Sequence, residues 1–349
     1  TAAIPAVHAD RLVAAEETGK AAVRLIETPI RPSRIITEKS VENALRVLMA
    51  VSGSTNAIVH LAAIAGRRGI VVSAERLNAI SDETPVLVDL KPVGEGYMED
   101  FFAAGGVGAV LRELKPLLHL DTIDVTGRTL EARLAEPAEW TDRKVIRPFD
   151  DPVSAVGGLI QLAGNLAPTG AIFKRAAATP DLFETEGRAV VFSSLEDLAA
   201  RVDDPDLDVT ASDILVLQNA GPLGAGMPEA GYLPIPKKLA RAGVKDMVRI
   251  SDARMSGTAF GTIVLHISPE AAAGGPLAAV RSGDRIRLSV GEKRIDLLVD
   301  DAEIARRLAE HRAPPAPERG YRALYHERVR QAPEGCDFDF LQGVSDHER

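Results

Sequence analysis

Apolar residues recur at helical spacing in the first part of the chain. One face of the segment SVENALRVLMAV is apolar at Val41, Ala44, Leu45, Leu48 and Met49. Ser40 precedes this face at the position of a helix N-cap. GSTN interrupts the pattern, AIVHLAAIAGRRG resumes it as a second helix, and PVLVDLKP is an apolar run of strand length. Helices that alternate with short apolar strands predict an α/β portion with a mainly parallel sheet over residues 1–150.

Strand-like runs dominate the next part of the chain. They are AIFK, RAVVF, DILVLQN, MVRIS, TIVLHIS, DRIRLSV and RIDLLV. In DRIRLSV, the apolar Ile286, Leu288 and Val290 alternate with polar neighbours, which is typical of a strand with one face in water. A short helix is expected at SLEDLAARV, where Ser194 and Asp197 occupy capping-box positions. Many short strands predict a β-barrel-like domain with flanking helices over residues 151–325.

The boundaries of these parts follow from composition. A length of 349 residues favours two domains, and the Pro- and Asp-rich stretch RPFDDPV marks the boundary near residue 150. The tail, residues 326–349, carries Phe338, Phe340 and Leu341, which need a partner surface, so we expect it to return to the first domain. Because the chain starts without Met and directly in a helical pattern, we expect it to begin within a longer sequence.

Charge and cysteine content narrow the partners and the compartment. The net charge of -9 argues against nucleic acid or an anionic membrane as the main partner. The start lacks the features of a signal peptide, and no stretch approaches the roughly 18 uninterrupted apolar residues of a membrane span. The one cysteine, Cys336, cannot form a disulfide within the chain or hold an iron–sulfur cluster by itself. These features predict a cytoplasmic protein.

Two loops hold candidate binding residues. Ser54, Thr55 and Asn56 in GSTN precede a helix, where free N–H groups can bind a carboxylate or phosphate of a substrate. Such residues also cap helices, and the residues alone favour capping. The loop NAGPLGAGMPEAG holds one acid, Glu229. Because Mg²⁺ needs several oxygen ligands, the residues alone favour a solvated acid over a metal ligand.

The segment SDARMSGTAFG holds candidate catalytic residues, Ser256 and Thr258, where a predicted strand ends. It is not a nucleophile elbow, because Met255 stands where that motif needs glycine. A serine that acts as a base needs stabilisation of its alkoxide. A catalytic base and a polar capping turn therefore both stay open. The histidines have no metal-ligand spacing and receive no role; His60 and His266 lie in apolar runs and are expected to be core residues with satisfied hydrogen bonds.

Taken together, the motifs resemble the dihydroxy-acid dehydratase and 6-phosphogluconate dehydratase family. The segments that carry the resemblance are SGSTNAIVHLAAIAGRRGI, DTIDVTGRTL, GGLIQLAGNLAPTGAIFK, LVLQNAGPLGAGMPE, ISDARMSGTAFG, SPEAAAGGPLAAVRSGD and GCDFDFL. SDARMSGT and GCDFDFLQ resemble the sugar-acid branch, such as L-arabinonate and D-xylonate dehydratases, more than the branched-chain amino-acid branch. The resemblance implies a hydro-lyase that converts a 2,3-dihydroxy acid, here an aldonic sugar acid, to a 2-keto-3-deoxy acid.

The resemblance also implies roles for single residues and two cofactors. Ser256 matches the base that removes the C2 proton, and Thr258 matches its neighbour in the same turn. Glu229 matches a carboxylate that helps to hold Mg²⁺ at the carboxylate end of the substrate. An iron–sulfur cluster, [2Fe–2S] or [4Fe–4S], is implied as the Lewis acid on the C3 hydroxyl.

We expect the resemblance to cover only the C-terminal part of the family, which implies that residues 1–150 are the C-terminal portion of its α/β N-domain. The cluster-bearing part is then absent, Cys336 matches no cluster position, and the isolated chain is expected to be inactive. The expected partners are a small sugar acid, the missing N-terminal portion and further copies in a homodimer or homotetramer, with neither nucleic acid nor membrane. Two alternatives stay open: a dihydroxy-acid dehydratase of branched-chain amino-acid synthesis, and a non-catalytic truncated remnant with a structural or binding role.

Overall fold

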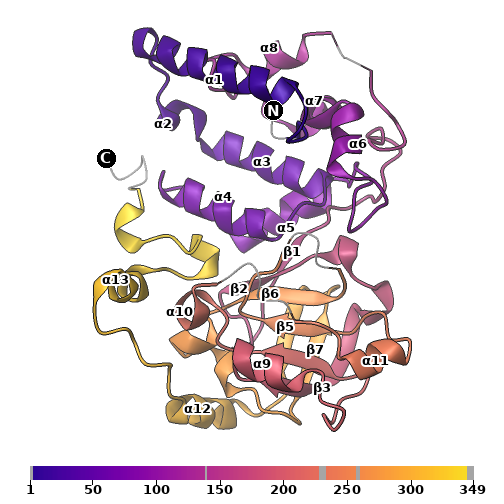
Figure 1. Cartoon of the computed structure of the whole chain (residues 1–349), viewed down its shortest axis with the longest axis vertical. Helices are drawn as coiled ribbons and strands as arrows, with labels where there is room; N and C mark the ends of the chain where they lie inside the picture. The colour runs from indigo at the N-terminus through magenta and orange to yellow at the C-terminus, as the bar shows by residue number, and fades with distance from the viewer. Residues whose placement is uncertain (1–2, 138–139, 228–232, 257–259, 344–349) are drawn as a thin grey trace. The chain divides into compact units, whose positions relative to one another are not determined.

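The computed structural model describes residues 3–137, 140–227, 233–256 and 260–343 (Figure 1). The chain divides into two compact units that alternate along the sequence. The first unit holds Thr1–Gly53, Glu75–Gly158 and Ser345–Arg349, and the second holds Ser54–Ala74 and Leu159–Val344. The predicted boundaries at residues 150 and 325 stay predictions.

The first unit is helical within its described residues. Its helices are α1 (Asp10–Glu27), α2 (Pro32–Ile35), α3 (Glu38–Ala50), α5 (Ala74–Glu83), α6 (Met98–Ala103), α7 (Gly106–Glu113), η1 (Lys115–Leu117) and α8 (Leu130–Leu134). The predicted apolar face of α3 is buried at Val41, Leu45, Leu48 and Met49. Its N-cap is Thr37, and the predicted cap Ser40 is instead the reciprocal member of the box, because the Ser40 Oγ accepts from the Thr37 N–H at 2.9 Å.

The parallel sheet expected in this part is not confirmed. The described residues of the first unit contain no strand. PVLVDLKP forms isolated bridges instead, which are antiparallel for Val86 with Ser154 and Val88 with Ile146 and parallel for Leu90 with Gly96. Pro85 and Pro92 bracket this run, and neither can donate a ladder hydrogen bond. Leu87 and Val88 are buried there together with Phe101, Val110 and Ile146. The apolar run therefore serves a helical core.

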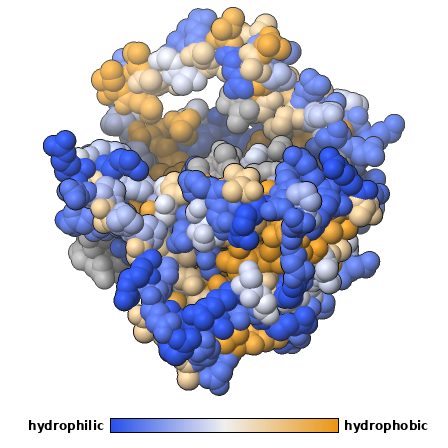
Figure 2. All heavy atoms as spheres, turned by 60° about the horizontal axis from the view of Figure 1, so that its bottom comes forward, coloured by the Kyte–Doolittle hydropathy of each residue, from blue (hydrophilic) through white to orange (hydrophobic). Residues whose placement is uncertain are grey.

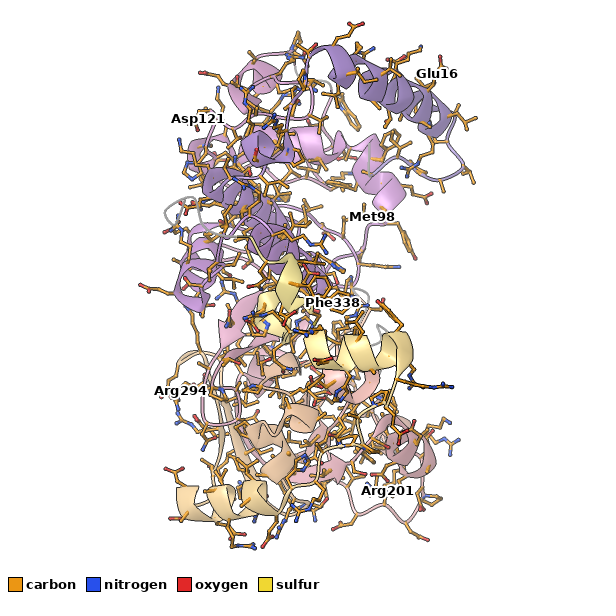
Figure 3. All side chains as sticks on the ribbon, turned by 90° about the vertical axis from the view of Figure 1, so that its left-hand side faces the viewer. Glu16, Met98, Asp121, Arg201, Arg294 and Phe338 are labelled. Carbon is orange, nitrogen blue, oxygen red and sulfur yellow. The ribbon has the colours of Figure 1, made fainter. Side chains whose placement is uncertain are left out.

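The second unit contains the predicted barrel. Its strands are β1 (Ile160–Leu162), β2 (Gly170–Phe173), β3 (Glu184–Phe192), β4 (Ile214–Leu217), β5 (Arg249–Ser251), β6 (Ile263–Ser268), β7 (Arg285–Ser289) and β8 (Arg294–Leu297). They form one sheet in the order β1-β2-β6-β5-β4-β3-β7-β8. Ala163, just after β1, bridges to Arg294 on β8, so the two edges meet and the sheet is nearly closed (Arg294 is labelled in Figure 3). The barrel-like domain is therefore confirmed.

Strands β3, β4, β5 and β6 pair in parallel, whereas the other pairs are antiparallel. Helices α9 (Leu195–Arg201), α10 (Pro222–Ala225) and α11 (Lys237–Arg241) connect the parallel strands. On β4, Ile214 and Val216 belong to one buried cluster with Ile286 and Ile295, while Leu215 and Leu217 belong to another with the α9 residue Leu198. Both faces of β4 are thus buried, which explains its unbroken apolar sequence.

The remaining short helices lie on loops and after the barrel. They are η2 (Arg175–Ala177), η3 (Pro180–Leu182), η4 (Ala271–Ala273), η5 (Pro276–Ala279), α12 (Asp301–Glu310), α13 (Gly320–Arg328), η6 (Ala332–Glu334) and η7 (Asp339–Leu341). Figure 2 shows that the forward face of the second unit is hydrophilic over much of its area, with hydrophobic patches between the polar residues. On α12, Arg307 pairs with Glu303 at 2.8 Å and with Asp284 at 2.5 Å.

The chain after the barrel packs on α4 (Asn56–Gly66), which belongs to the second unit. Arg67 and Asp337 form a two-pronged ion pair with N–O distances of 2.7 and 2.9 Å. A side chain at Gly335 would come within 2.3 Å of the Ala63 backbone nitrogen, so this close approach requires glycine. Phe338, which is labelled in Figure 3, stacks on Phe340 and meets the rings of Tyr321 and Tyr325 of α13 edge-on.

No helix in the described part of the chain combines the length and the apolar character that a membrane crossing requires.

Candidate functional site

Ser256 lies five residues after the end of β5, in the segment SDARMS that follows this strand. The segment is held in place by packing, because four of its residues are buried: Ser251, Asp252, Ala253 and Met255. Ser256 itself is exposed. An exposed hydroxyl on a firmly packed segment is a suitable arrangement for a catalytic group.

Asn56 connects the GSTN segment to this one. Its side-chain amide Nδ2 donates to the carbonyl oxygen of Met255 at 2.9 Å, between residues 199 positions apart. Ser54 Oγ accepts from the Asn56 N–H at 3.1 Å, and Thr55 makes no side-chain capping bond to α4. The structure therefore places two separate predicted site segments beside each other. Whether Ser54, Thr55 and Asn56 bind substrate stays a prediction.

Arg254 connects the third predicted segment. Its Nε donates to the carbonyl oxygen of Met227 at 2.8 Å, and Met227 ends the described part of the loop that leads to Glu229. Arg254 as a whole residue is half-buried. Two of the predicted residues, Glu229 and Thr258, lie outside the described residues, so their predicted roles stay predictions.

Asp252 is a buried carboxylate that sequence reasoning left without a role. Its two oxygens accept backbone N–H groups of Ala220 and Ala271, each at 2.9 Å. Burial raises the pKa of Asp252 to about 7, and the negative charge of Glu270 adds to this rise against the effect of the N–H donors. Sequence reasoning also missed Glu270, which has no exposed surface. The signal was present as a lone acid in the small and apolar segment SPEAAAGG.

The two histidines of the apolar runs differ from expectation. His60 is exposed on α4, because it falls on the solvent side of that helix. His266 is buried, yet neither ring nitrogen has a hydrogen-bond partner, so the prediction that its hydrogen bonds are satisfied is wrong. His266 has a positive φ of 58° at the register shift between β2 and β6, so its side chain does not follow the alternation of the strand. Burial lowers the pKa of His266 to about 3, and the imidazole stays neutral.

The described residues do not fit the two implied cofactors. Cys336, the one cysteine of the chain, lies 3.3 Å from the Met227 sulfur, and burial raises the pKa of its thiol to about 12. A cluster ligand is a thiolate, and a cluster takes several of them. Among the described residues, no group of three or more His, Cys, Asp or Glu side chains is placed to hold a metal ion. No chemical step is therefore assigned to either group from this structure.

Comparison with family models matches both halves of the chain. Residues 1–133 match the dihydroxy-acid/6-phosphogluconate dehydratase N-terminal model, and residues 144–336 match the C-terminal model of the same family. The prediction that the chain covers only the C-terminal part is therefore wrong. SGSTNAIVHLAAIAGRRGI and DTIDVTGRTL both lie in the region of the N-terminal model.

Individual relatives are similar over nearly the whole chain. An L-arabonate dehydratase of Azospirillum brasilense is 48% identical over 98% of this chain and 60% of its own length. A 6-deoxy-6-sulfo-D-gluconate dehydratase of Pseudomonas putida is 47% identical over 97% of this chain and 59% of its own length. A dihydroxy-acid dehydratase of Acetivibrio thermocellus is 42% identical over 95% of this chain and 60% of its own length. The chain thus spans about 60% of the length of these curated relatives, and it belongs to the dihydroxy-acid/6-phosphogluconate dehydratase family.

Proposed function

We propose that this chain forms part of a hydro-lyase that dehydrates a 2,3-dihydroxy acid to a 2-keto-3-deoxy acid. The observation that carries the proposal is the bond from Asn56 Nδ2 to the Met255 carbonyl, which joins two segments of the family resemblance next to Ser256. The family membership supports the reaction class. The described part of the chain contributes a packed segment on which Ser256 is exposed.

The substrate we propose is an aldonic sugar acid. Two relatives named for sugar acids are 48% and 47% identical to this chain, against 42% for a dihydroxy-acid dehydratase. An aldonic acid differs from the branched-chain substrate in carrying further hydroxyls, and each of these needs a polar partner when the substrate is enclosed.

In the proposed reaction, the alkoxide of Ser256 removes the proton from C2, and the C3 hydroxyl leaves and takes up this proton to form water, which restores the alkoxide. The electron pair of the C2–H bond forms the C2–C3 double bond, and the resulting enol ketonises to the 2-keto acid. A serine hydroxyl has a pKa far above neutral, so it works as a base only where its alkoxide is stabilised. In the family, an iron–sulfur cluster and Mg²⁺ supply the Lewis acidity for this chemistry when they are bound. We further propose that the chain alone is inactive, since its described residues fit neither group.

The test is an assay of two proteins under anaerobic conditions. One is the chain alone, and the other joins the chain to the portion of the A. brasilense relative that it does not span; we call this second protein the joined enzyme. Both are given iron, sulfide and Mg²⁺ and are offered L-arabinonate, D-xylonate, D-gluconate and 2,3-dihydroxy-3-methylbutanoate. We expect the joined enzyme to release 2-keto acid from an aldonic acid and the chain alone to release none.

Each outcome of this assay decides one part of the proposal. Turnover of the branched-chain acid alone contradicts the aldonic substrate, and turnover by the chain alone contradicts its inactivity. A joined enzyme that turns over none of the acids contradicts the proposed reaction and favours the remnant.

A further inference from the structure

Glu270 is a fully buried carboxylate whose hydrogen-bond donors among the described residues are all amide groups. Its oxygens accept the backbone N–H of Leu223, at 2.8 and 3.0 Å, and that of Gly224, at 3.0 Å. The side-chain Nε2 of Gln331 donates to Oε1 at 2.8 Å. None of the ion pairs among the described residues includes Glu270. Its negative charge is therefore balanced by converging N–H dipoles.

The fit around this carboxylate is close. A side chain at Gly221 would come within 2.6 Å of the Glu270 Oε2 atom. Gly221 is the N-cap residue of α10, and Leu223 and Gly224 lie within that short helix. An anion at the first turn of a helix satisfies N–H groups that have no partner inside the helix. Glu270 thus fixes the conformation of residues 219–227, which we call the loop around α10.

Gln331 brings the C-terminal part of the chain to the same point. Its Oε1 accepts the backbone N–H of Glu270 at 2.9 Å, while its Nε2 donates to the Glu270 carboxylate. This pairing needs an acceptor and a donor on one planar amide, opposite a donor and an acceptor on residue 270. Cys336, five residues further along, contacts Met227 of the same loop.

The loop around α10 is connected in turn to the segment that carries Ser256. The Ala220 N–H donates to Asp252, and the Met227 carbonyl accepts from Arg254. These two contacts lie at the start and at the end of the described loop. A displacement of the loop therefore moves both supports of the segment from Asp252 to Ser256.

We propose that Glu270 is a positioning residue, which holds Ser256 in place through the loop around α10 and couples that loop to Gln331. The part that concerns catalysis rests on the proposed function. Glu270 acts on Ser256 only through Leu223, Gly224 and the two contacts described above, and it takes no part in the chemistry itself.

The first variant is Glu270→Gln. One amide oxygen cannot accept from Leu223, Gly224 and Gln331 together, and the new NH₂ group faces one of these donors. We expect hydrogen exchange in residues 219–227 and 251–256 of the chain to rise about tenfold or more, with exchange in β7 and β8 unchanged. In the joined enzyme, we expect kcat to fall by about 10², with KM nearly unchanged, because misplacement of a catalytic group acts on the chemical step.

The control variant is Asp246→Asn. Asp246 precedes β5 and also carries a buried carboxylate, which accepts from the hydroxyls of Thr262 at 2.7 Å and Thr179 at 2.8 Å and pairs with Arg249 at 3.3 Å. Thr262 immediately precedes β6, at the other end of the β5–β6 connection from Ser256, and none of the contacts of Asp246 among the described residues reaches residues 219–227 or 251–256. We expect a similar loss of thermal stability from this variant, with kcat and exchange in residues 219–227 unchanged.

The rescue variant is Glu270→Gln combined with Gln331→Glu. The new carboxylate at position 331 accepts from the backbone and the new amide of position 270, which frees the amide oxygen for Leu223 and Gly224. We expect both exchange and kcat to return to within about threefold of the wild type. Wild-type exchange and kcat in Glu270→Gln, a uniform rise of exchange over the barrel, or no recovery in the double variant would each overturn the proposal. A joined enzyme without any activity overturns the proposed function, and the exchange measurement alone then decides on Glu270.

Discussion

Asp252 Oδ1 accepts the backbone N–H of Ala220 at 2.9 Å, between residues 32 positions apart. Its other oxygen accepts the N–H of Ala271. One side chain after β5 therefore fixes the chain after β4 and the chain after β6. These are the carboxyl ends of three neighbouring parallel strands, the edge where open α/β sheets place their sites.

The pKa of Asp252 predicts an unusual pH dependence of stability. The folded pKa, about 7, lies above the ordinary value of 3.8. Its contribution to stability is then fully present below about pH 4 and is lost as the pH rises to about 7. We expect the stability difference between the wild type and Asp252→Asn to shrink over this range and to stay constant above it. Urea unfolding at several pH values, followed by far-ultraviolet circular dichroism, measures it.

Asp246→Asn is expected to show the opposite pH dependence of stability. Its N–H and hydroxyl donors hold the pKa of Asp246 below the ordinary value despite burial. Its contribution is present above about pH 4 and is lost at lower pH. We expect the cost of Asp246→Asn to be constant between pH 5 and 8. A parallel response of the two variants would contradict both assignments.

Ser256→Ala is the direct test of the proposed base. The substitution removes one exposed oxygen, so the packing of the buried neighbours Met255 and Ala253 is preserved. We expect turnover of the joined enzyme to fall by about 10² or more, and Thr258→Val to cost less, because a threonine orients and does not abstract. The measurement is exchange of the C2 proton into deuterated water. Exchange at the wild-type rate in Ser256→Ala would mean that another group is the base. The control variant is Ser212→Ala, at an exposed position of the second unit, and we expect it to exchange the C2 proton at the wild-type rate.

The thiol of Cys336 is expected to be unreactive in the folded protein. Its pKa of about 12, against an ordinary 9.0, lowers the thiolate fraction at pH 8 by about 10³. Because this is the one cysteine of the chain, a single labelling rate reports on it. We expect modification by an aromatic disulfide reagent to be slow in buffer and fast in denaturant. Equal rates in both would show that the contact with Met227 and the burial do not persist in solution.

Lys174 is expected to lower the stability of the barrel at neutral pH. It is 8% exposed, and no ion pair or hydrogen bond of its ammonium group is found among the described residues. Burial lowers the pKa of Lys174 from 10.5 to about 8, so its contribution to stability is lost as the pH falls through this range. This difference in the pKa of Lys174 corresponds to a loss of about 3 kcal/mol in the free energy of unfolding.

Lys174→Met removes the buried charge at nearly constant volume. We expect it to raise the free energy of unfolding at pH 7 and to have a smaller effect at pH 10. Lys245→Met, at an exposed position, is the matched control and is expected to change stability by less than about 0.5 kcal/mol. A destabilised Lys174→Met variant would mean that the ammonium group has a favourable partner.

The sequence by itself determined the strands of the barrel. Seven strand-like runs correspond to β2 through β8, because alternation and β-branched content are local properties of each segment. It also determined the cap of α9, where Ser194 accepts from the Asp197 N–H. The short strand β1 was missed, since three residues carry too little pattern. The resemblance of seven motifs pointed to the family, which the comparisons confirm.

Only the tertiary structure decided which segments meet. Asn56 and Met255 are 199 positions apart, and nothing local to either one indicates their hydrogen bond. In the same way, PVLVDLKP has the pattern of a strand but is buried among helices. Glu270 has the composition of a solvated acid, yet it is buried because N–H groups from Leu223 and Gly224 and an amide from Gln331 converge on it. The spacing of apolar residues is a property of neighbours along the chain, so the sequence reveals it. The partners of a buried charge come from distant segments, so only their packing in the fold decides them.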